Sequence, residues 1–261
     1  FADHERVKVN FILYTESKGV CRARKLLREM VTDEDYFLQT DSHMRSIPEW
    51  DKAMIESLND THCEQPVLSA YPPHYNPDDA EKSYLKTSSF MNVTEFSLPV
   101  KRTQSHHGCG PTYLNETGVP IRNLRVSAGF HFAPAAWLKD AIYPDNYYWD
   151  GEEDQLTILS YTHGWSIFCP ERVLVYHCAL NNLLESPEKY RPLHWEDHPE
   201  MAHSKELFGK FSTDLLKNGS ARSLDDYFRE LTHFTENFQW FELSTEFASI
   251  DKVEIASFEL F

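Results

Sequence analysis

The sequence has little positive charge, few glycines and no long hydrophobic run. Lys and Arg number 25 against 41 Asp and Glu, so the formal net charge of the 261 residues is −16 with histidine neutral. A duplex-binding surface needs basic residues to neutralise phosphates, which excludes nucleic acid as a partner. No run of 18 apolar residues exists, so we expect no membrane-spanning segment in this chain. Nine glycines and 14 prolines exclude collagen-like and low-complexity chains.

The cysteines are also few, and no Cys-x-x-Cys pair occurs among the five. An odd number without such pairs argues against a disulfide framework and favours reduced thiols in the cytoplasm. Four Asn-x-Ser/Thr patterns, at residues 59, 92, 115 and 218, point the other way. Since the first residue is Phe1 and not Met, the alternative is the Golgi lumen after removal of an N-terminal anchor.

Apolar residues make up 41% of the chain, as in an ordinary globular protein. In the first 70 residues, short β-rich runs alternate with helical patterns, which predicts a layered α/β sheet. The expected elements are a strand over Val7 to Tyr14, a helix over Arg22 to Met30, a buried strand over Tyr36 to Thr40, a helix over Glu49 to Leu58 and a strand over Pro66 to Ala70.

Turn-forming residues are concentrated between residues 71 and 120, which predicts a loop-rich insertion. Beyond it we expect a strand over Val126 to Phe132, a short helix over Pro134 to Lys139, a helix that begins at Asp150-Gly151, a strand over Arg172 to His177 and a helix over 204–232. We expect one large domain over 1–235. A C-terminal appendage over 236–261 follows, and its apolar and polar alternation indicates one or two strands.

A candidate metal site follows the strand predicted at Tyr36 to Thr40. Asp41 and His43 are separated by one residue at the end of that strand, where α/β sheets place ligand sites. A carboxylate and an imidazole together suit a divalent cation such as Mn²⁺. The alternative is that Asp41 caps a turn and His43 is a solvated loop residue.

A basic segment runs from Lys18 to Arg28 with no acidic residue in it. A glycine turn that leads into a helix N-terminus offers backbone donors to phosphate oxygens, and arginines add charge. The alternative is a solvated helix face.

Small residues at Ser127 to Gly129 allow a ligand to approach the backbone closely. The later Trp149-Asp-Gly-Glu-Glu153 run adds carboxylates that accept hydrogen bonds from sugar hydroxyls, and a ring that stacks on a sugar face. The alternative is an acidic helix cap beside a buried tryptophan. His177 stands at the end of a β-rich run, and alone it is typical of a structural histidine.

Taken together and in order, these motifs resemble the polypeptide α-N-acetylglucosaminyltransferases, whose cytoplasmic members glycosylate hydroxyproline on an adaptor of ubiquitin ligases. The chain is also similar, more distantly, to the mucin-type polypeptide N-acetylgalactosaminyltransferases. The motifs that carry the resemblance are Gly19-Val-Cys-Arg22-Ala-Arg24, Tyr36-Phe-Leu-Gln-Thr-Asp41-Ser-His43, Trp50-Asp51, Ser127-Ala-Gly-Phe-His-Phe132, Tyr143-Pro-Asp145, Trp149-Asp-Gly-Glu-Glu153, Thr162-His-Gly-Trp165 and His177.

The resemblance implies a retaining glycosyltransferase of the GT-A (Rossmann-like) fold that transfers GlcNAc from UDP-GlcNAc to a hydroxyl of a protein, on hydroxyproline, Ser or Thr. It implies Mn²⁺ or Mg²⁺ as cofactor, with Asp41, His43 and His177 as ligands. The donor would be bound by Arg22, Arg24, Asp41, Ala128, Gly129, Trp149, Glu152 and Glu153. Glu152 and Asp150 would be the catalytic carboxylates, and Trp165 with His163 would line the acceptor side.

The chain departs from the family pattern at its N-terminus, because the usual first nucleotide-binding strand does not precede Phe1. This departure leaves a non-catalytic relative that binds a glycan or a protein as an alternative. Transfer from UDP-GalNAc or UDP-galactose is a second alternative. The partners we expect are a UDP-sugar donor and a protein acceptor, and the tail leaves a homodimer open.

Overall fold

The computed structural model describes residues 7–13, 16–75, 87–93, 109–115, 118–143, 148, 151–178, 219–231 and 233. Residues 224–231 are helical. The other helices and strands are α1 (Gly19–Arg28), β1 (Tyr36–Thr40), β2 (Met44–Ser46), α2 (Trp50–Asp60), β3 (Pro66–Ser69), β4 (His74–Tyr75), β5 (Thr87–Val93), β6 (Cys109–Asn115), β7 (Ile121–Asn123), β8 (Phe130–Pro134), the 3-10 helix η2 (Ala135–Lys139), α3 (Glu152–Thr162), β9 (Ser166–Cys169) and β10 (Val175–Cys178).

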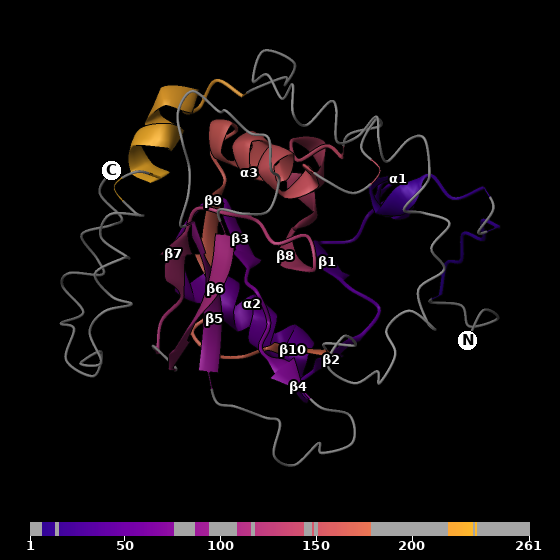
Figure 1. Cartoon of the computed structure of the whole chain (residues 1–261), viewed down its shortest axis with the longest axis horizontal. Helices are drawn as coiled ribbons and strands as arrows, with labels where there is room; N and C mark the ends of the chain where they lie inside the picture. The colour runs from indigo at the N-terminus through magenta and orange to yellow at the C-terminus, as the bar shows by residue number, and fades with distance from the viewer. Residues whose placement is uncertain are drawn as a thin grey trace.

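A five-stranded mixed sheet in the order β1-β8-β3-β9-β7 forms the centre of the fold, with β1 on the side of α1 (Figure 1). Strands β3 and β9 are parallel, and the other neighbours in this sheet are antiparallel. The chain therefore has the mixed α/β architecture that the alternating sequence pattern predicts.

Core residues cover both faces of this sheet. Successive side chains of a strand point to opposite faces, so neighbouring residues of one strand belong to different core clusters. Leu68, Phe132 and Phe168 share one core cluster with α2 and with residues of the helix at 224–231. Their neighbours Val67, Ala133 and Ile167 face the second cluster, to which α1, η2 and α3 contribute. Every residue of α3 is buried, so this helix is enclosed and not amphipathic.

A second, three-stranded sheet in the order β2-β10-β4 fixes the position of His177. Strand β10 pairs antiparallel with β2, and His177 lies opposite Met44 in that register. The amide of Cys178 also donates to the carbonyl of His43 at 2.9 Å. Two segments more than 130 residues apart in the chain are therefore held side by side by backbone hydrogen bonds.

The strand predicted over Val7 to Tyr14 is wrong where the structure describes it. Residues 7–13 form no strand, and the side chains of Phe11 and Val9 are 81% and 60% exposed. A β-rich sequence forms a strand only when a neighbouring strand and a buried face stabilise it, and no described strand pairs with this segment. Strand β1 has the predicted bounds but is not fully buried, because it is the outermost strand of its sheet.

The strand predicted over Val126 to Phe132 is also wrong in its first half, because β8 begins only at Phe130. Residues 128 and 129 form a turn, closed by an isolated bridge between Ser127 and Phe130. The amides of Ser127 and Ala128 bond to the side chains of Ser69 and Glu153 and not to the backbone of a neighbouring strand. The strand predicted from Arg172 likewise starts later, at Val175.

Strands β4, β5 and β6 lie between residues 71 and 120, and β5 pairs with β6 as an antiparallel hairpin. The loop signals did not predict them, and nothing predicted β9. The helix predicted over 204–232 is confirmed at residues 224–231 and wrong at 219–223, which are not helical, while 204–218 lie outside the described residues. The appendage predicted over 236–261 lies outside them as well.

None of the described helices is long and apolar enough to cross a bilayer. Cys21, Cys63, Cys169 and Cys178 are free thiols in the described part of the chain.

Candidate functional site

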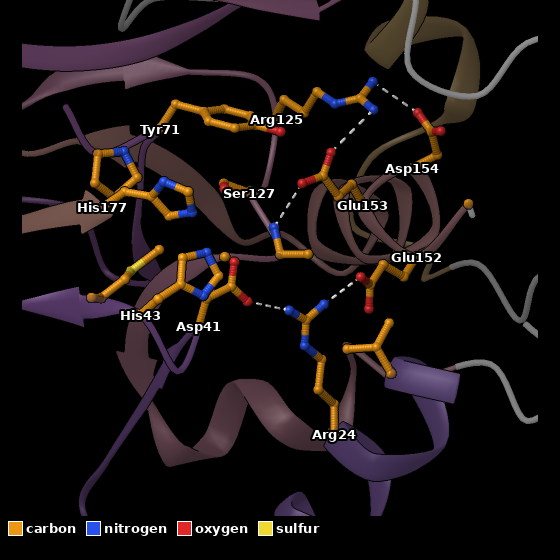
Figure 2. A pocket seen from close by; sticks show the side chains of 16 residues that line it. Arg24, Asp41, His43, Tyr71, Arg125, Ser127, Glu152, Glu153, Asp154 and His177 are labelled. Atoms are coloured by element: carbon orange, nitrogen blue, oxygen red, sulfur yellow. Dashed lines mark hydrogen bonds and ion pairs between the residues drawn. The ribbon is translucent and has the colours of Figure 1, made fainter. Parts of the chain in front are cut away.

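A cavity of about 400 Å³ opens between the N-terminal end of α3, the turn at 127–129 and the end of β1 (Figure 2). Most of the residues that the sequence singled out lie on its wall. The lining residues are Val20, Arg24, Asp41, His43, Met44, Tyr71, Pro72, Arg125, Ser127, Ala128, Gly129, Gly151, Glu152, Glu153, Asp154 and His177.

Asp41, His43 and His177 converge on one side of this cavity. Their nearest ligand atoms all lie within 4.8 Å of one another, and the three side chains are half-buried. The imidazole rings of His43 and His177 meet edge to face at 4.4 Å between centroids. The pairing of β2 with β10 explains this, because His43 immediately precedes β2 and His177 belongs to β10. One carboxylate and two imidazoles suit a divalent transition metal such as Mn²⁺.

Gly129 leaves room for the Asp41 carboxylate. A Cβ atom at position 129 would lie 2.9 Å from Oδ2 of Asp41 and 3.3 Å from Cε of Met44. The amide of Asp41 also donates to the carbonyl of Gly129 at 3.0 Å. The glycine and the carboxylate are therefore in direct contact, and a side chain at position 129 has to displace Asp41.

Gly129→Ala is accordingly expected to weaken Mn²⁺ binding by about 10-fold, because a displaced ligand loses its place in the coordination set. Isothermal titration of the full chain with MnCl₂ measures this change. Gly118→Ala is the control, since position 118 does not line the cavity and a Cβ atom there meets nothing within 4 Å. Its φ of +75° strains an alanine locally, so the unfolding free energy of this variant is measured beside its Mn²⁺ affinity. Unchanged Mn²⁺ affinity in Gly129→Ala would show that Asp41 is not a ligand.

Arg24 joins Asp41 to Glu152 across the floor of the cavity. Its guanidinium donates to Oδ1 of Asp41 at 2.7 Å and also to Oε1 of Glu152 (Figure 2). Burial by itself lowers the pKa of Arg24, but the negative charges beside it, Glu152 foremost, raise that pKa above its usual range. Burial raises the pKa of the Glu152 carboxyl, and Arg24 opposes that rise. The cation therefore favours the ionised form of this buried carboxyl, against the effect of burial.

Carboxylates outnumber arginines on the cavity wall. Arg24 and Arg125 face Asp41, Glu152, Glu153 and Asp154, and each arginine is already paired with two of these carboxylates. A diphosphate that entered this cavity would meet a net negative charge. An added cation on the histidine side would reverse the sign locally.

His131 supports the turn at 127–129 from below. Its Nδ1–H donates to the carbonyl of Ser127 at 3.0 Å, and the ring packs edge-on against Trp137 at 4.9 Å. Burial above all, together with the nearby Arg28 and Arg24 charges, lowers the pKa of His131 from 6.5 to about 3, although the hydrogen bond to Ser127 raises it. The ring therefore stays neutral in the folded protein at any mildly acidic pH.

A pH-dependent loss of stability follows from the His131 pKa. Below pH 6.5 the unfolded chain binds a proton at His131 and the folded chain does not, so stability falls as the pH falls toward 3. Between pH 7 and pH 5 this group is expected to cost about 2 kcal/mol of unfolding free energy. Urea unfolding at both pH values measures it. His131→Asn keeps a donor for Ser127 and should show a smaller difference, and an equal difference would contradict the assignment.

Arg22, Trp165 and His163 are not brought to this cavity. Arg22 lies along a groove on the outer side of α1, so Arg24 is the arginine of the pair that reaches Asp41. Trp165 and His163 follow the C-terminal end of α3, whereas the cavity is at its N-terminal end. Trp149 and Asp150 lie outside the described residues, so their roles stay predictions.

Trp165 is buried in the core, and its Nε1–H donates to Oδ2 of Asp140 at 2.8 Å. Trp165→Phe is therefore expected to lower the unfolding free energy by about 1 to 2 kcal/mol and to leave UDP affinity and acceptor turnover unchanged. Chemical denaturation and a UDP-release assay measure the two. A large loss of turnover at wild-type stability would restore Trp165 to the acceptor side.

Sequence reasoning missed Arg125, Tyr71 and Met44, which line the cavity. Arg125 lies two residues before the small-residue run at 127–129, and its position there was the only local signal. Tyr71 and Met44 carry no signal that separates them from core or loop residues.

A family model described as "Glycosyltransferase (GlcNAc)" matches residues 2–210, which is most of the chain. The chain belongs to this glycosyltransferase family. A family member binds a sugar donor and an acceptor, and the wall of small residues, carboxylates and histidines described above is the part of the chain where such chemistry fits. No curated protein matches the chain significantly.

Proposed function

We propose that this chain is a retaining, metal-dependent transferase of GT-A fold that moves GlcNAc from UDP-GlcNAc to a hydroxyl group of a protein. We assign it to the hydroxyproline-type polypeptide α-GlcNAc transferases, with Ser and Thr as the other acceptor residues. Family membership supports the transferred sugar. The observation that carries the proposal is that a candidate metal triad, a small-residue turn and a buried glutamate line a single cavity.

Asp41, His43 and His177 fit a divalent cation in their donor atoms and in their spacing, and we propose that they hold Mn²⁺ or Mg²⁺. When bound, this cation supplies Lewis-acid stabilisation of the departing diphosphate. The half-exposed position of the triad leaves room for diphosphate oxygens beside it.

Residues of the opposite wall would hold the sugar. The turn at Ala128 and Gly129 lets a sugar ring approach the backbone, and Glu152 accepts hydrogen bonds from sugar hydroxyls. Arg24 favours the ionised form of Glu152 and bonds to its carboxylate on the cavity wall. We propose that Arg24 also presents its charge to the donor diphosphate.

In the transfer step, the bond between the anomeric carbon and the diphosphate oxygen breaks. The acceptor oxygen attacks the same face and forms the new glycosidic bond. The proton of the acceptor hydroxyl passes to the departing diphosphate oxygen, so no side chain of this protein is required as general base. The role of the chain is to orient both partners and to stabilise the negative charge that develops.

We further propose a cytoplasmic location, which the four free thiols support.

A panel of UDP-sugars tests the function. The full chain with Mn²⁺ is incubated with UDP-GlcNAc, UDP-GalNAc or UDP-galactose, with and without peptides that carry Ser, Thr or hydroxyproline, and UDP release is measured. We expect the highest rate with UDP-GlcNAc and loss of that rate in Asp41→Ala. A higher rate with UDP-GalNAc or UDP-galactose would mean that this sugar nucleotide, and not UDP-GlcNAc, is the donor. Absence of UDP release with every sugar would favour a non-catalytic relative.

A further inference from the structure

We propose that Arg125 and Glu153 are positioning residues that hold the turn at Ser127–Gly129 in the shape that receives the donor sugar. This inference rests on the proposed function, in which that turn is the sugar-facing wall. It also replaces the prediction that Glu153 itself contacts the donor.

Arg125 is buried at 2% exposure directly behind the turn. Its guanidinium bonds to Oδ1 of Asp154 at 2.9 Å and lies 3.5 Å from Oε2 of Glu153 (Figure 2). Both carboxylates are in the first turn of α3 and are themselves buried. The arginine therefore compensates two adjacent negative charges in a site where water cannot do so.

Both carboxylate oxygens of Glu153 have a protein partner. Oε1 accepts the backbone amide of Ala128 at 2.9 Å, while Oε2 faces Arg125. Glu153 thus links the backbone of the turn to Arg125 and to α3, so their positions determine where the Ala128 amide is held. A charge-assisted bond of this kind holds a backbone group more tightly than a neutral one.

The other polar groups of the turn are held in the same way. The amide of Ser127 donates to Oγ of Ser69 at 2.7 Å, and the carbonyl of Ala128 accepts from Nε2 of Gln39 at 2.6 Å. The carbonyl of Gly129 accepts the amide of Asp41 at 3.0 Å. The bond from Ala128 to Glu153 ties this network to α3, and Arg125 fixes its carboxylate. Just before the turn, the amide of Val126 also donates to Oγ1 of Thr157 in α3 at 2.9 Å.

The consequence is specific to the sugar. Arg125 and Glu153 are not part of the metal triad, and Glu153 bonds to Ala128 and not to Gly129, the turn residue that contacts Asp41. Loss of the Glu153 bond should therefore weaken binding of the sugar and leave binding of UDP largely intact. A residue that only stabilises the fold would affect both ligands equally or neither.

The test compares binding of UDP with binding of UDP-GlcNAc to the full chain, by isothermal titration in Mn²⁺, for wild type, Glu153→Gln, Arg125→Lys and Arg125→Met. We expect Kd for UDP to stay within about twofold of wild type. We expect Kd for UDP-GlcNAc to rise about 10-fold in Glu153→Gln and in Arg125→Met. Arg125→Lys keeps the charge and should recover part of the loss.

Arg122→Met is the matched control. Arg122 is another largely buried arginine of the same sheet region, paired with Glu230 at 3.4 Å, and it does not line the cavity. It should lower thermal stability without changing either Kd.

Glu153→Gln keeps the side-chain shape, so it tests the bond between Glu153 and the Ala128 amide even if Arg125→Met fails to fold. Equal changes for UDP and UDP-GlcNAc in folded Glu153→Gln, or no change for either, would overturn the positioning role. If wild type binds UDP tightly but binds UDP-GlcNAc no more tightly than the variants do, the positioning role of Arg125 and Glu153 is wrong, while nucleotide binding is confirmed. Wild type that binds neither ligand would overturn the proposed function and this inference together.

Discussion

His177→Ala is expected to weaken Mn²⁺-dependent binding of UDP by at least about 100-fold while the domain stays folded. His177 supplies one of three candidate ligands within 4.8 Å of one another, and two remaining ligands hold a divalent cation poorly. Without the cation, the diphosphate faces a wall with more carboxylates than arginines. Isothermal titration of UDP in excess Mn²⁺ measures the loss, and circular dichroism checks the fold.

His163→Ala is the control for that experiment. His163 is also a half-buried histidine, but its ring bonds to the carbonyl of Leu159 at 2.8 Å, and it lies away from the cavity. It should leave UDP binding unchanged. If His177→Ala kept wild-type affinity, the three-ligand assignment would be wrong.

Arg24→Met is expected to reduce UDP-GlcNAc turnover by about 100-fold and the unfolding free energy by about 3 kcal/mol. Removing one partner of a buried ion pair leaves an uncompensated charge, and here two carboxylates, Asp41 and Glu152, lose the same cation. UDP release and urea unfolding measure the two effects. Arg24→Lys should fall between wild type and Arg24→Met, because it keeps the charge but not the bidentate geometry.

The Arg24→Met variant should also depend on pH in a defined direction. The pKa of Glu152 is already raised by burial, and loss of Arg24 raises it further. The folded variant then holds a proton that the unfolded chain releases, so its stability should fall, relative to wild type, as the pH rises from 5 to 8. Equal pH dependence in the two proteins would mean that Arg24 does not control the ionisation of Glu152.

The elements that sequence reasoning predicted well are those with a clear local sequence pattern. The helix α2 has a clear apolar face, and the bounds of β1 and β3 follow from short apolar runs flanked by turn residues. The segment at residues 7–13 has the same β-rich composition and forms no strand, because strand formation depends on a partner that composition does not reveal. Residues 127–129 were wrongly predicted to continue a strand, because the side chains of Ser69 and Glu153, and not a neighbouring strand, bind the amides of Ser127 and Ala128.

The candidate site divides in the same way. Asp41 and His43 could be singled out from the sequence, because only one residue separates them and they follow a strand. His177 entered only through the family resemblance, since its approach to His43 depends on the pairing of β2 with β10. Arg125 was missed because its partners Glu153 and Asp154 are 28 and 29 residues further along, and only the folded chain shows that they meet.

The net charge of −16 makes the dependence of UDP affinity on metal the most direct test of the proposed site. Charges on distant surfaces are screened beyond about 10 Å, so the affinity of this acidic chain for a nucleoside diphosphate depends on what lies in the cavity itself. Titration of UDP into the full chain, with Mn²⁺ and again with EDTA, measures that dependence. We predict binding with Mn²⁺ and a loss of at least about 100-fold when the metal is chelated. Equal UDP affinity in both conditions would contradict a metal-dependent donor site at Asp41, His43 and His177.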